Sequence, residues 1–233
     1  RFALMNDIVR EANYWANRGA ARAIGAAHVT QAIAERHRRN SLFESHLQQM
    51  LTDDIIIVHT DGRRVGQVNG LSVYQMGDAS FGKPTLITAT ASVGSAGIIN
   101  IEREANLSGG IYDKGVLIIT GYLRRMFAHN KPLALTASLC FEQSYTGVDG
   151  DSASIAEIFA LVSELSGVPL DQSFAVTGSI SQRGQIQPIG GVNEKIEGFF
   201  ELCRARGLTG SQGVIIPAHN VGDLMLRDDV IEA

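Results

Sequence analysis

The spacing of the apolar residues changes near residue 55, and this change constrains the fold more than any other feature of the sequence. Before that point apolar residues such as Ile8, Ala12 and Ala16 recur every three or four positions, as in an amphipathic helix. After it, short apolar runs are separated by glycines, which is typical of strands. We therefore predict a small helical segment, residues 1–40, followed by a larger domain, residues 41–233.

The larger domain is predicted to mix strands and helices. Strands are predicted at residues 55–59, 64–73, 85–92, 98–103, 116–120, 133–141, 174–180 and 214–216. Amphipathic helices are predicted over 154–166 and 193–206, where apolar residues follow the three-four spacing and a glycine comes directly after. Residues 115–127 are ambiguous between strand and helix, with a helix fitting 122–127, and a short helix also fits 223–227. This order of elements favours a mixed α/β fold, in the broad sense that includes α+β.

Composition and charge argue against several classes of protein. The chain has 233 residues, of which 45% are hydrophobic, which is enough for a folded core. The formal net charge of −4 does not indicate a nucleic-acid partner. No apolar run approaches the ~18 residues that a membrane-spanning helix needs, so no membrane partner is predicted.

The two cysteines, Cys140 and Cys203, lie in apolar surroundings and lack the spacing of a disulfide framework or a zinc site. We interpret them as small buried residues in a reducing compartment, and therefore expect a cytoplasmic protein. The chain begins at Arg1 and shows no signal-peptide pattern. We therefore interpret it as a piece of a longer protein.

The sequence lacks the short motifs of many common enzymes. It contains no G-x-x-x-x-G-K-[ST] phosphate loop, no G-x-G-x-x-G after a strand, no H-E-x-x-H and no G-x-S-x-G. The six histidines are scattered along the chain. We therefore predict that this chain itself binds no metal ion and no cofactor.

The segment Asp149-Gly150-Asp151-Ser152 lies directly before the strongest predicted helix. Serine and aspartate are preferred helix caps, so a simple cap is one interpretation, and the local sequence alone favours it. The other interpretation is chemical. The first backbone N–H groups of a helix have no partner within it, and a serine placed there can act as a nucleophile when a base lies nearby.

Lys195 is the candidate base. The chain has 16 arginines but only four lysines, and Lys195 lies beside the apolar face of the predicted helix 193–206, near its N-terminus. Burial and the positive end of the helix dipole both lower the pKa of a lysine in such a place. A neutral lysine can accept the proton of a serine hydroxyl. The alternative is a lysine that extends along the helix into solvent.

Three segments together resemble the proteolytic domain of the Lon proteases, which use a Ser–Lys dyad. They are Asp149-Gly150-Asp151-Ser152-Ala153-Ser154, Thr177-Gly178-Ser179-Ile180 and Pro188-Ile189-Gly190-Gly191-Val192-Asn193-Glu194-Lys195. Their order and separations match the family, with 25 residues from Ser152 to Thr177 and 43 from Ser152 to Lys195. The similarity covers about residues 50–220.

Finer features resemble the LonB-like branch of that family. The LonA branch has proline where this chain has Asp151. The runs Phe141-Glu142-Gln143-Ser144-Tyr145 and Asn69-Gly70-Leu71-Ser72-Val73 also look like bacterial LonB-like proteins. Residues 1–40 resemble the end of the helical lid subdomain of an AAA+ module, which precedes the protease domain in this family.

The resemblance implies a role for each matching residue. Ser152 would be the nucleophile, Lys195 the general base, and Thr177 would position the lysine or be an ordinary strand residue. Asp149 would either pair with Lys195, raising the lysine's pKa and opposing catalysis, or simply form the turn. The backbone N–H groups of Asp151 and Ser152 are candidates for the oxyanion hole. A peptide substrate would add as a strand to residues 97–103, unless these form an internal strand.

The resemblance also implies a function for the chain. It predicts a serine endopeptidase that degrades unfolded or damaged proteins or peptides through an acyl-enzyme, assembled as a homo-hexameric ring. ATP and Mg²⁺ would be used by an ATPase module absent from this chain, unless that branch has a degenerate ATPase. The alternative is a catalytically silent Lon-like scaffold or a peptide-binding ring module.

Overall fold

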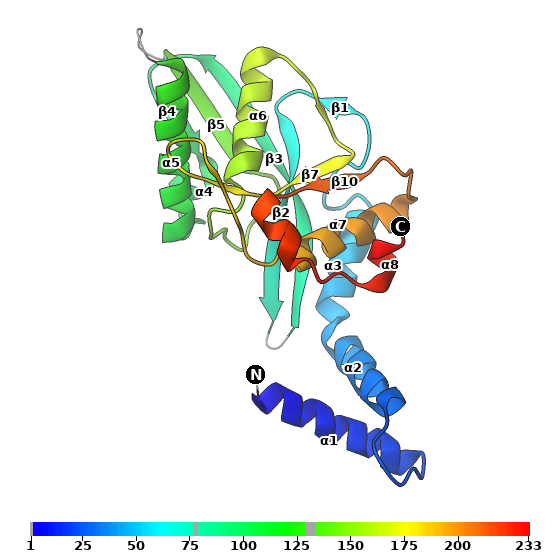
Figure 1. Cartoon of the computed structure of the whole chain (residues 1–233). Helices are drawn as coiled ribbons and strands as arrows, with labels where there is room; N and C mark the ends of the chain where they lie inside the picture. Colours follow the sequence, from blue (N-terminus) through cyan, green and yellow to red (C-terminus); the bar gives the residue numbers. More distant parts are fainter. Residues whose placement is uncertain (1, 77–78, 129–133) are drawn as a thin grey trace. The chain divides into compact units, whose positions relative to one another are not determined.

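The computed structural model describes residues 2–76, 79–128 and 134–233 (Figure 1). Its internal contacts divide it into two compact units. One comprises Arg1–Gln49 and Met76–Ala79, and the other comprises Met50–Gln75 and Ser80–Ala233. The helix α3, Leu42–Thr52, crosses this division, and the domain boundary proposed between residues 40 and 41 stays a prediction.

The smaller unit is helical, as its apolar spacing predicts. Helix α1, Phe2–Arg18, packs against α2, Ala26–Asn40. Small buried alanines allow the close approach, among them Ala12 on α1 and Ala32 on α2. An ion pair of 3.3 Å between Arg36 and Glu11 also joins the two helices.

The larger unit is built on a six-stranded mixed sheet with the order β10-β7-β2-β3-β5-β4 (Figure 1). The strands are Gly213–Ile215 (β10), Phe174–Val176 (β7), Gln67–Met76 (β2), Ala79–Val93 (β3), Leu135–Phe141 (β5) and Gly97–Asn100 (β4). β3 runs antiparallel to β5, whereas the pairs β10–β7, β2–β7 and β4–β5 are parallel. Two further pairs join β1, Arg63–Arg64, to β6, Leu170–Asp171, and β8, Ser179–Ile180, to β9, Ile186–Gln187.

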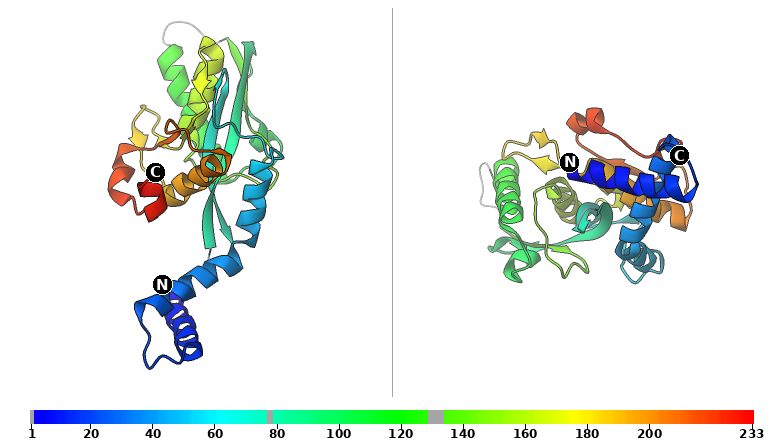
Figure 2. Two further views of the ribbon diagram at one scale, coloured as in Figure 1. Left: turned by 90° about the vertical axis from the view of Figure 1, so that its right-hand side faces the viewer. Right: turned by 90° about the horizontal axis from the view of Figure 1, so that it is seen from below.

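Helices cover both faces of this sheet (Figure 2). α5, Gly110–Phe127, and α6, Ser154–Ser166, share one apolar core with Val176 of β7. The neighbouring Ala175 points to the opposite face, because side chains alternate along a strand, and packs with Phe199 of α7, Val192–Arg206. The predicted mixed α/β fold is confirmed.

Three short helices complete the larger unit. They are α4, Ile101–Glu104, the 3₁₀ helix Ala218–Asp223, and α8, Asp228–Ile231. In the part of the chain that the structure describes, no helix is both long enough and apolar enough to cross a membrane.

The strand predicted at residues 116–120 is wrong, because this segment lies in the middle of α5. Its run of branched apolar residues is typical of strands. In the structure the buried residues of α5 recur every three or four positions instead: Tyr112, Val116, Ile119 and Leu123. Packing of this face against the sheet outweighs the local strand preference.

The strand predicted at residues 55–59 is also wrong. Burial alternates there, with Ile56 and Val58 buried and Ile57 exposed, as it would along a strand. The backbone bonds elsewhere, however, because the Ile56 N–H donates to the carbonyl of Met50 and the Ile57 N–H to the side chain of Gln143.

Several predicted boundaries shift in the structure. The strand at 98–103 ends at Asn100, whose side chain caps α4 by accepting the Arg103 N–H. Residues 174–180 form two strands interrupted at Thr177 and Gly178, and the helix predicted at 223–227 falls between two short helices. The strand predicted from Leu133 begins at Leu135, and Leu133 itself lies outside the described residues.

Candidate active site

Ser152 lies in a tight turn that leads into α6. The turn begins at Gly150, whose φ of +92° is a conformation that residues with a side chain rarely adopt. The carbonyl of Ser152 accepts the Gly178 N–H at 2.7 Å and the Thr177 hydroxyl at 3.1 Å. The interruption between β7 and β8 therefore anchors the turn that carries the serine.

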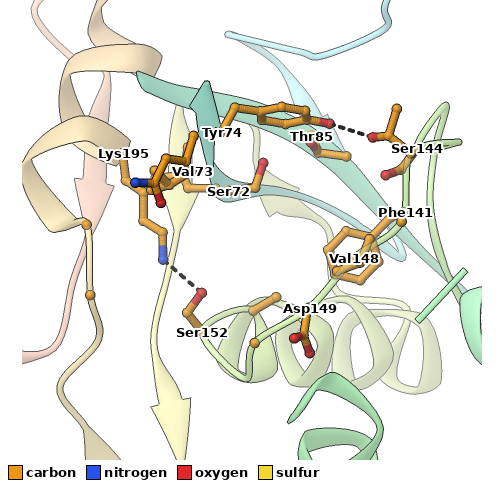
Figure 3. A pocket seen from close by; sticks show the side chains of 18 residues that line it. Ser72, Val73, Tyr74, Thr85, Phe141, Ser144, Val148, Asp149, Ser152 and Lys195 are labelled. Atoms are coloured by element: carbon orange, nitrogen blue, oxygen red, sulfur yellow. Dashed lines mark hydrogen bonds between the residues drawn. The ribbon is translucent and has the colours of Figure 1, made fainter. Parts of the chain in front are cut away.

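Lys195 lies in the first turn of α7 and is only 2% exposed. Its Nζ atom is 2.8 Å from the Oγ of Ser152 (Figure 3). The same atom is 3.1 Å from the Oγ1 of Thr177. As an ammonium group, Lys195 donates to both hydroxyls. As a neutral amine, it can accept the hydroxyl proton of Ser152 on its lone pair. The structure thus brings together Ser152 from the turn before α6, Lys195 from α7 and Thr177 from the residues that follow β7.

Two glycines allow α7 to lie directly on the sheet. A Cβ atom at Gly82 of β3 would collide with the backbone of Glu194, and a Cβ at Gly198 would collide with the backbone of Gly82. The helix therefore rests with its backbone against the backbone of the strand. This close approach fixes how far the Lys195 side chain reaches toward Ser152.

Burial lowers the pKa of Lys195 to about 8, because an ammonium group loses its hydration there. The carboxylates of Asp151 and Glu194 oppose this shift by favouring the charged form. A considerable fraction of the lysine is therefore neutral near pH 8. A neutral amine is the protonation state that a general base needs.

Asp149 does not contact Lys195. Its Oδ1 accepts the backbone N–H groups of Ile111 and Tyr112, both at 3.2 Å, in the first turn of α5. Hydrogen bonds from backbone N–H groups, with that of Gly150 the strongest, hold the pKa of its exposed carboxyl below the usual range. Of the two interpretations open for this residue, the geometry matches a structural role in the turn.

Asp151 points toward the neighbouring β8. Its Oδ2 accepts the hydroxyl of Ser179 at 2.7 Å. Among the hydrogen bonds within the described ranges, the backbone N–H groups of Asp151 and Ser152 have no protein acceptor. Unpaired N–H groups beside a nucleophile are what an oxyanion hole requires, and the assignment of this role stays a prediction.

A groove of about 450 Å³ runs past Ser152 and Lys195. One wall is residues 71–75 of β2, and the other includes residues 146–150 (Figure 3). β2 pairs with β7 only at Asn69 and Gly70, so residues 71–73, which line the groove, have no partner strand on that side among the described residues. Residues 97–103, predicted to receive a substrate strand, do not line this groove.

Sequence reasoning missed the groove wall of β2 and the hydroxyl of Ser179. Both lie in segments that carry the family resemblance, Asn69-Gly70-Leu71-Ser72-Val73 and Thr177-Gly178-Ser179-Ile180. The matching motifs were therefore a usable signal, although they do not say which edge of a strand stays open. No group of His, Cys, Asp and Glu in the described part of the chain is arranged to hold a metal ion.

Comparison with known proteins agrees with the fold. A model of the C-terminal proteolytic domain of Lon protease matches residues 139–231, and a model of the AAA+ ATPase LID domain of archaeal LonB matches residues 1–39. These matches, together with the relatives below, place the chain in the Lon protease family.

Several curated relatives carry Lon in their names. A Lon protease homolog of Escherichia coli is 43% identical over 86% of this chain and 35% of its own length. A Lon protease homolog of Haemophilus influenzae is 46% identical over 78% of this chain and 31% of its own length. An archaeal Lon protease of Methanothermobacter thermautotrophicus is 34% identical over 80% of this chain and 29% of its own length. The chain thus spans about a third of the length of these relatives.

Proposed function

We propose that this chain is the proteolytic part of a serine endopeptidase in which Ser152 is the nucleophile and Lys195 the general base. The observation that carries the proposal is the 2.8 Å contact between the Ser152 Oγ and the Lys195 Nζ. Burial of this lysine, which lowers its pKa to about 8, supports the same assignment because only the neutral amine can take a proton.

The proposed reaction proceeds in two halves. Lys195 takes the hydroxyl proton of Ser152 as the Oγ attacks the peptide carbonyl, and the backbone N–H groups of Asp151 and Ser152 stabilise the oxyanion that forms. The Lys195 ammonium then gives its proton to the leaving amine, which departs and leaves an ester on Ser152. A water molecule attacks this ester while Lys195 takes its proton, and collapse of the intermediate returns a proton to Ser152.

Thr177 is proposed to hold the base in place. Its hydroxyl accepts a hydrogen bond from Lys195 and donates one to the carbonyl of Ser152, so it ties the base to the turn that carries the nucleophile. A substrate in extended conformation is proposed to add as a strand to the open edge of residues 71–73, which places its backbone beside Ser152.

The substrates, assembly and location of the whole protein are further proposals that rest on the family. We propose unfolded or damaged proteins as substrates and a homo-hexameric ring as the assembly. ATP and Mg²⁺ would act in an ATPase module that the AAA+ lid match points to, since this sequence has no phosphate loop of its own. A cytoplasmic location stays a prediction.

Hydrolysis of casein, measured without and with ATP, tests the proposed chemistry. The parent chain is compared with Ser152→Ala and Lys195→Ala, and with Ser166→Ala and Lys114→Ala as matched controls distant from the groove. Cleavage in the parent and both controls, lost in the two site variants, is the expected result. Cleavage that survives in Ser152→Ala would contradict the dyad. Absence of cleavage from every version, with fully folded protein, would favour a silent scaffold.

A further inference from the structure

Tyr112 contacts both ends of the segment that carries Ser152. It lies in the first turn of α5 and is 1% exposed. Its backbone N–H donates to the Oδ1 of Asp149 at 3.2 Å, three residues before the serine. Its hydroxyl donates to the Oε1 of Glu157 at 2.6 Å, five residues after the serine. One residue of the neighbouring helix α5 thus hydrogen-bonds to the chain on both sides of Ser152 in the sequence, at Asp149 and at Glu157. We call these two hydrogen bonds the Tyr112 bracket.

The hydroxyl end of this bracket is fully buried. Glu157 is 1% exposed, and among the described residues it forms no ion pair. Burial raises the pKa of Glu157 to about 7, with the carboxyl of Glu102 adding to the shift, so much of it is neutral at neutral pH. The amide of Asn100 donates to the Tyr112 hydroxyl, and burial also raises the pKa of that hydroxyl, which keeps it a donor.

The other anchors of the segment act at different points. The carbonyl of Ser152 is held by Gly178 and Thr177, and the side chain of Asp151 by Ser179. None of these contacts reaches Glu157, and Asp149 is held by the backbone N–H groups of Ile111 and Gly150 beside that of Tyr112. The position of α6 relative to α5, and with it the direction in which the Ser152 side chain leaves its turn, therefore depends on contacts such as those of Tyr112.

We propose that Tyr112, acting through its hydrogen bonds to Asp149 and Glu157, is a positioning residue that holds the Ser152 hydroxyl against Lys195. The proposal rests on the proposed function of Ser152 and Lys195. Tyr112 itself is not hydrogen-bonded to Ser152 or Lys195 and does not line the groove. Removing its hydroxyl leaves the buried side-chain amide of Asn100 without an acceptor and the buried carboxyl of Glu157 without a donor. Because unpaired buried polar groups are costly, we expect α6 to shift relative to α5.

The test replaces the hydroxyl alone. Tyr112→Phe keeps the ring, which packs edge-on against Phe141 with centroids 5.5 Å apart. Tyr122→Phe is the matched control, since it makes the same chemical change on the same helix outside the bracket. Glu157→Gln is the conservative variant, because an amide oxygen still accepts the Tyr112 hydroxyl. Peptide hydrolysis and thermal unfolding are measured for all of these variants and the parent, at a temperature where each is folded.

We expect the kcat of Tyr112→Phe to fall on the order of 10- to 100-fold with little change in KM, because a displacement of about 1 Å at a nucleophile has an effect of this size. Tyr122→Phe keeps the parent kcat, and Glu157→Gln keeps most of it. A second readout is the pKa of Lys195, followed by NMR on the labelled side chains of the four lysines. Loosening the turn admits water to the amine, so this pKa rises in Tyr112→Phe, although Asp151 and Glu194 also face it.

The NMR titration separates this proposal from the proposed function. A raised Lys195 pKa in Tyr112→Phe, with an unchanged value in Tyr122→Phe, supports positioning even if the parent shows no peptidase activity. An unchanged Lys195 pKa together with an unchanged kcat in Tyr112→Phe would overturn the proposal. So would a loss of kcat that Tyr122→Phe shares to the same extent.

Discussion

The amine of Lys195 lies 2.8 Å from the hydroxyl of Ser152, although 43 positions separate the two residues in the chain. The serine comes from the turn before α6 on one face of the sheet, and the lysine from α7 on the other. They meet where β7 ends and Thr177 interrupts the strand. Because the two residues come from opposite faces of the sheet, their distance depends on how closely α6 and α7 each pack on the sheet.

The activity is expected to rise with pH. Only the neutral amine of Lys195 can take the serine proton, and burial lowers the pKa of this group to about 8. The profile of kcat/KM for a peptide substrate should therefore climb through about pH 8 and level off above it. A profile that is flat from pH 6 to 10 would contradict a lysine base.

Lys195 is expected to destabilise the fold that it serves. Its pKa is about 8 in the folded chain and near 10.5 when unfolded, so the penalty of the buried charge is complete below pH 8 and disappears as the pH rises through 10.5. Lys195→Met should raise the free energy of unfolding by up to about 3 kcal/mol at pH 7, and by much less at pH 10. Urea unfolding at both pH values measures this. A variant less stable than the parent at pH 7 would show that the hydrogen bonds of the amine outweigh its burial.

Thr177→Val is expected to lower kcat by roughly 10- to 100-fold, because the base loses one of its two hydroxyl partners and the Ser152 carbonyl loses a donor. Thr177→Ser keeps the hydroxyl and should keep most of the activity. Steady-state kinetics with a fluorogenic peptide compares the two. Equal activity in both variants would mean that the hydroxyl has no part in positioning.

Gly82→Ala is expected to lower kcat although Gly82 does not line the groove. The added methyl group meets the backbone of Glu194, so α7 must move and Lys195 moves with it. We expect a loss of stability of about 1–3 kcal/mol and a larger fall in kcat than this loss of stability explains. Gly222→Ala is the control, because a Cβ at that position has nothing within 4 Å. Normal kcat in folded Gly82→Ala would argue against the close approach.

Asp149 separates two interpretations. If it caps α5 as in the structure, Asp149→Asn keeps an acceptor for Ile111 and Tyr112 and leaves the pH profile of kcat/KM in place. If it paired with Lys195 during the reaction, the same change would move the rising limb of the kcat/KM profile to lower pH.

The pKa of the Asp149 carboxyl is lowered in the folded chain, so its contribution to the free energy of unfolding is present at neutral pH and is lost as the pH falls through that pKa. Asp149→Ala should remove this part of the pH dependence of the free energy of unfolding, which urea unfolding of the variant and the parent at neutral and acid pH measures.

Local sequence was sufficient for part of the fold. The helices α6 and α7 were predicted within a residue of their observed ends, because their apolar spacing and the glycines that follow them act over a single turn. The strand predicted at 116–120 and the strand predicted at 55–59 failed for the opposite reason. Their residues suit a strand locally, and only their partners in the tertiary structure decide that one is a helix and the other is irregular.

The candidate residues for the chemistry could be named from the sequence, since Ser152, Thr177 and Lys195 stand in motifs whose residue types and separations are recognisable in the chain. The sequence did not determine whether Asp149 faces the lysine, which edge of β2 stays open, or that Tyr112 brackets the nucleophile. The tertiary structure decided these points, because hydrogen bonds such as those from Tyr112 to Asp149 and Glu157 join residues 37 and 45 positions apart. Contacts over such separations depend on how the helices pack on the sheet, and no local pattern encodes that packing.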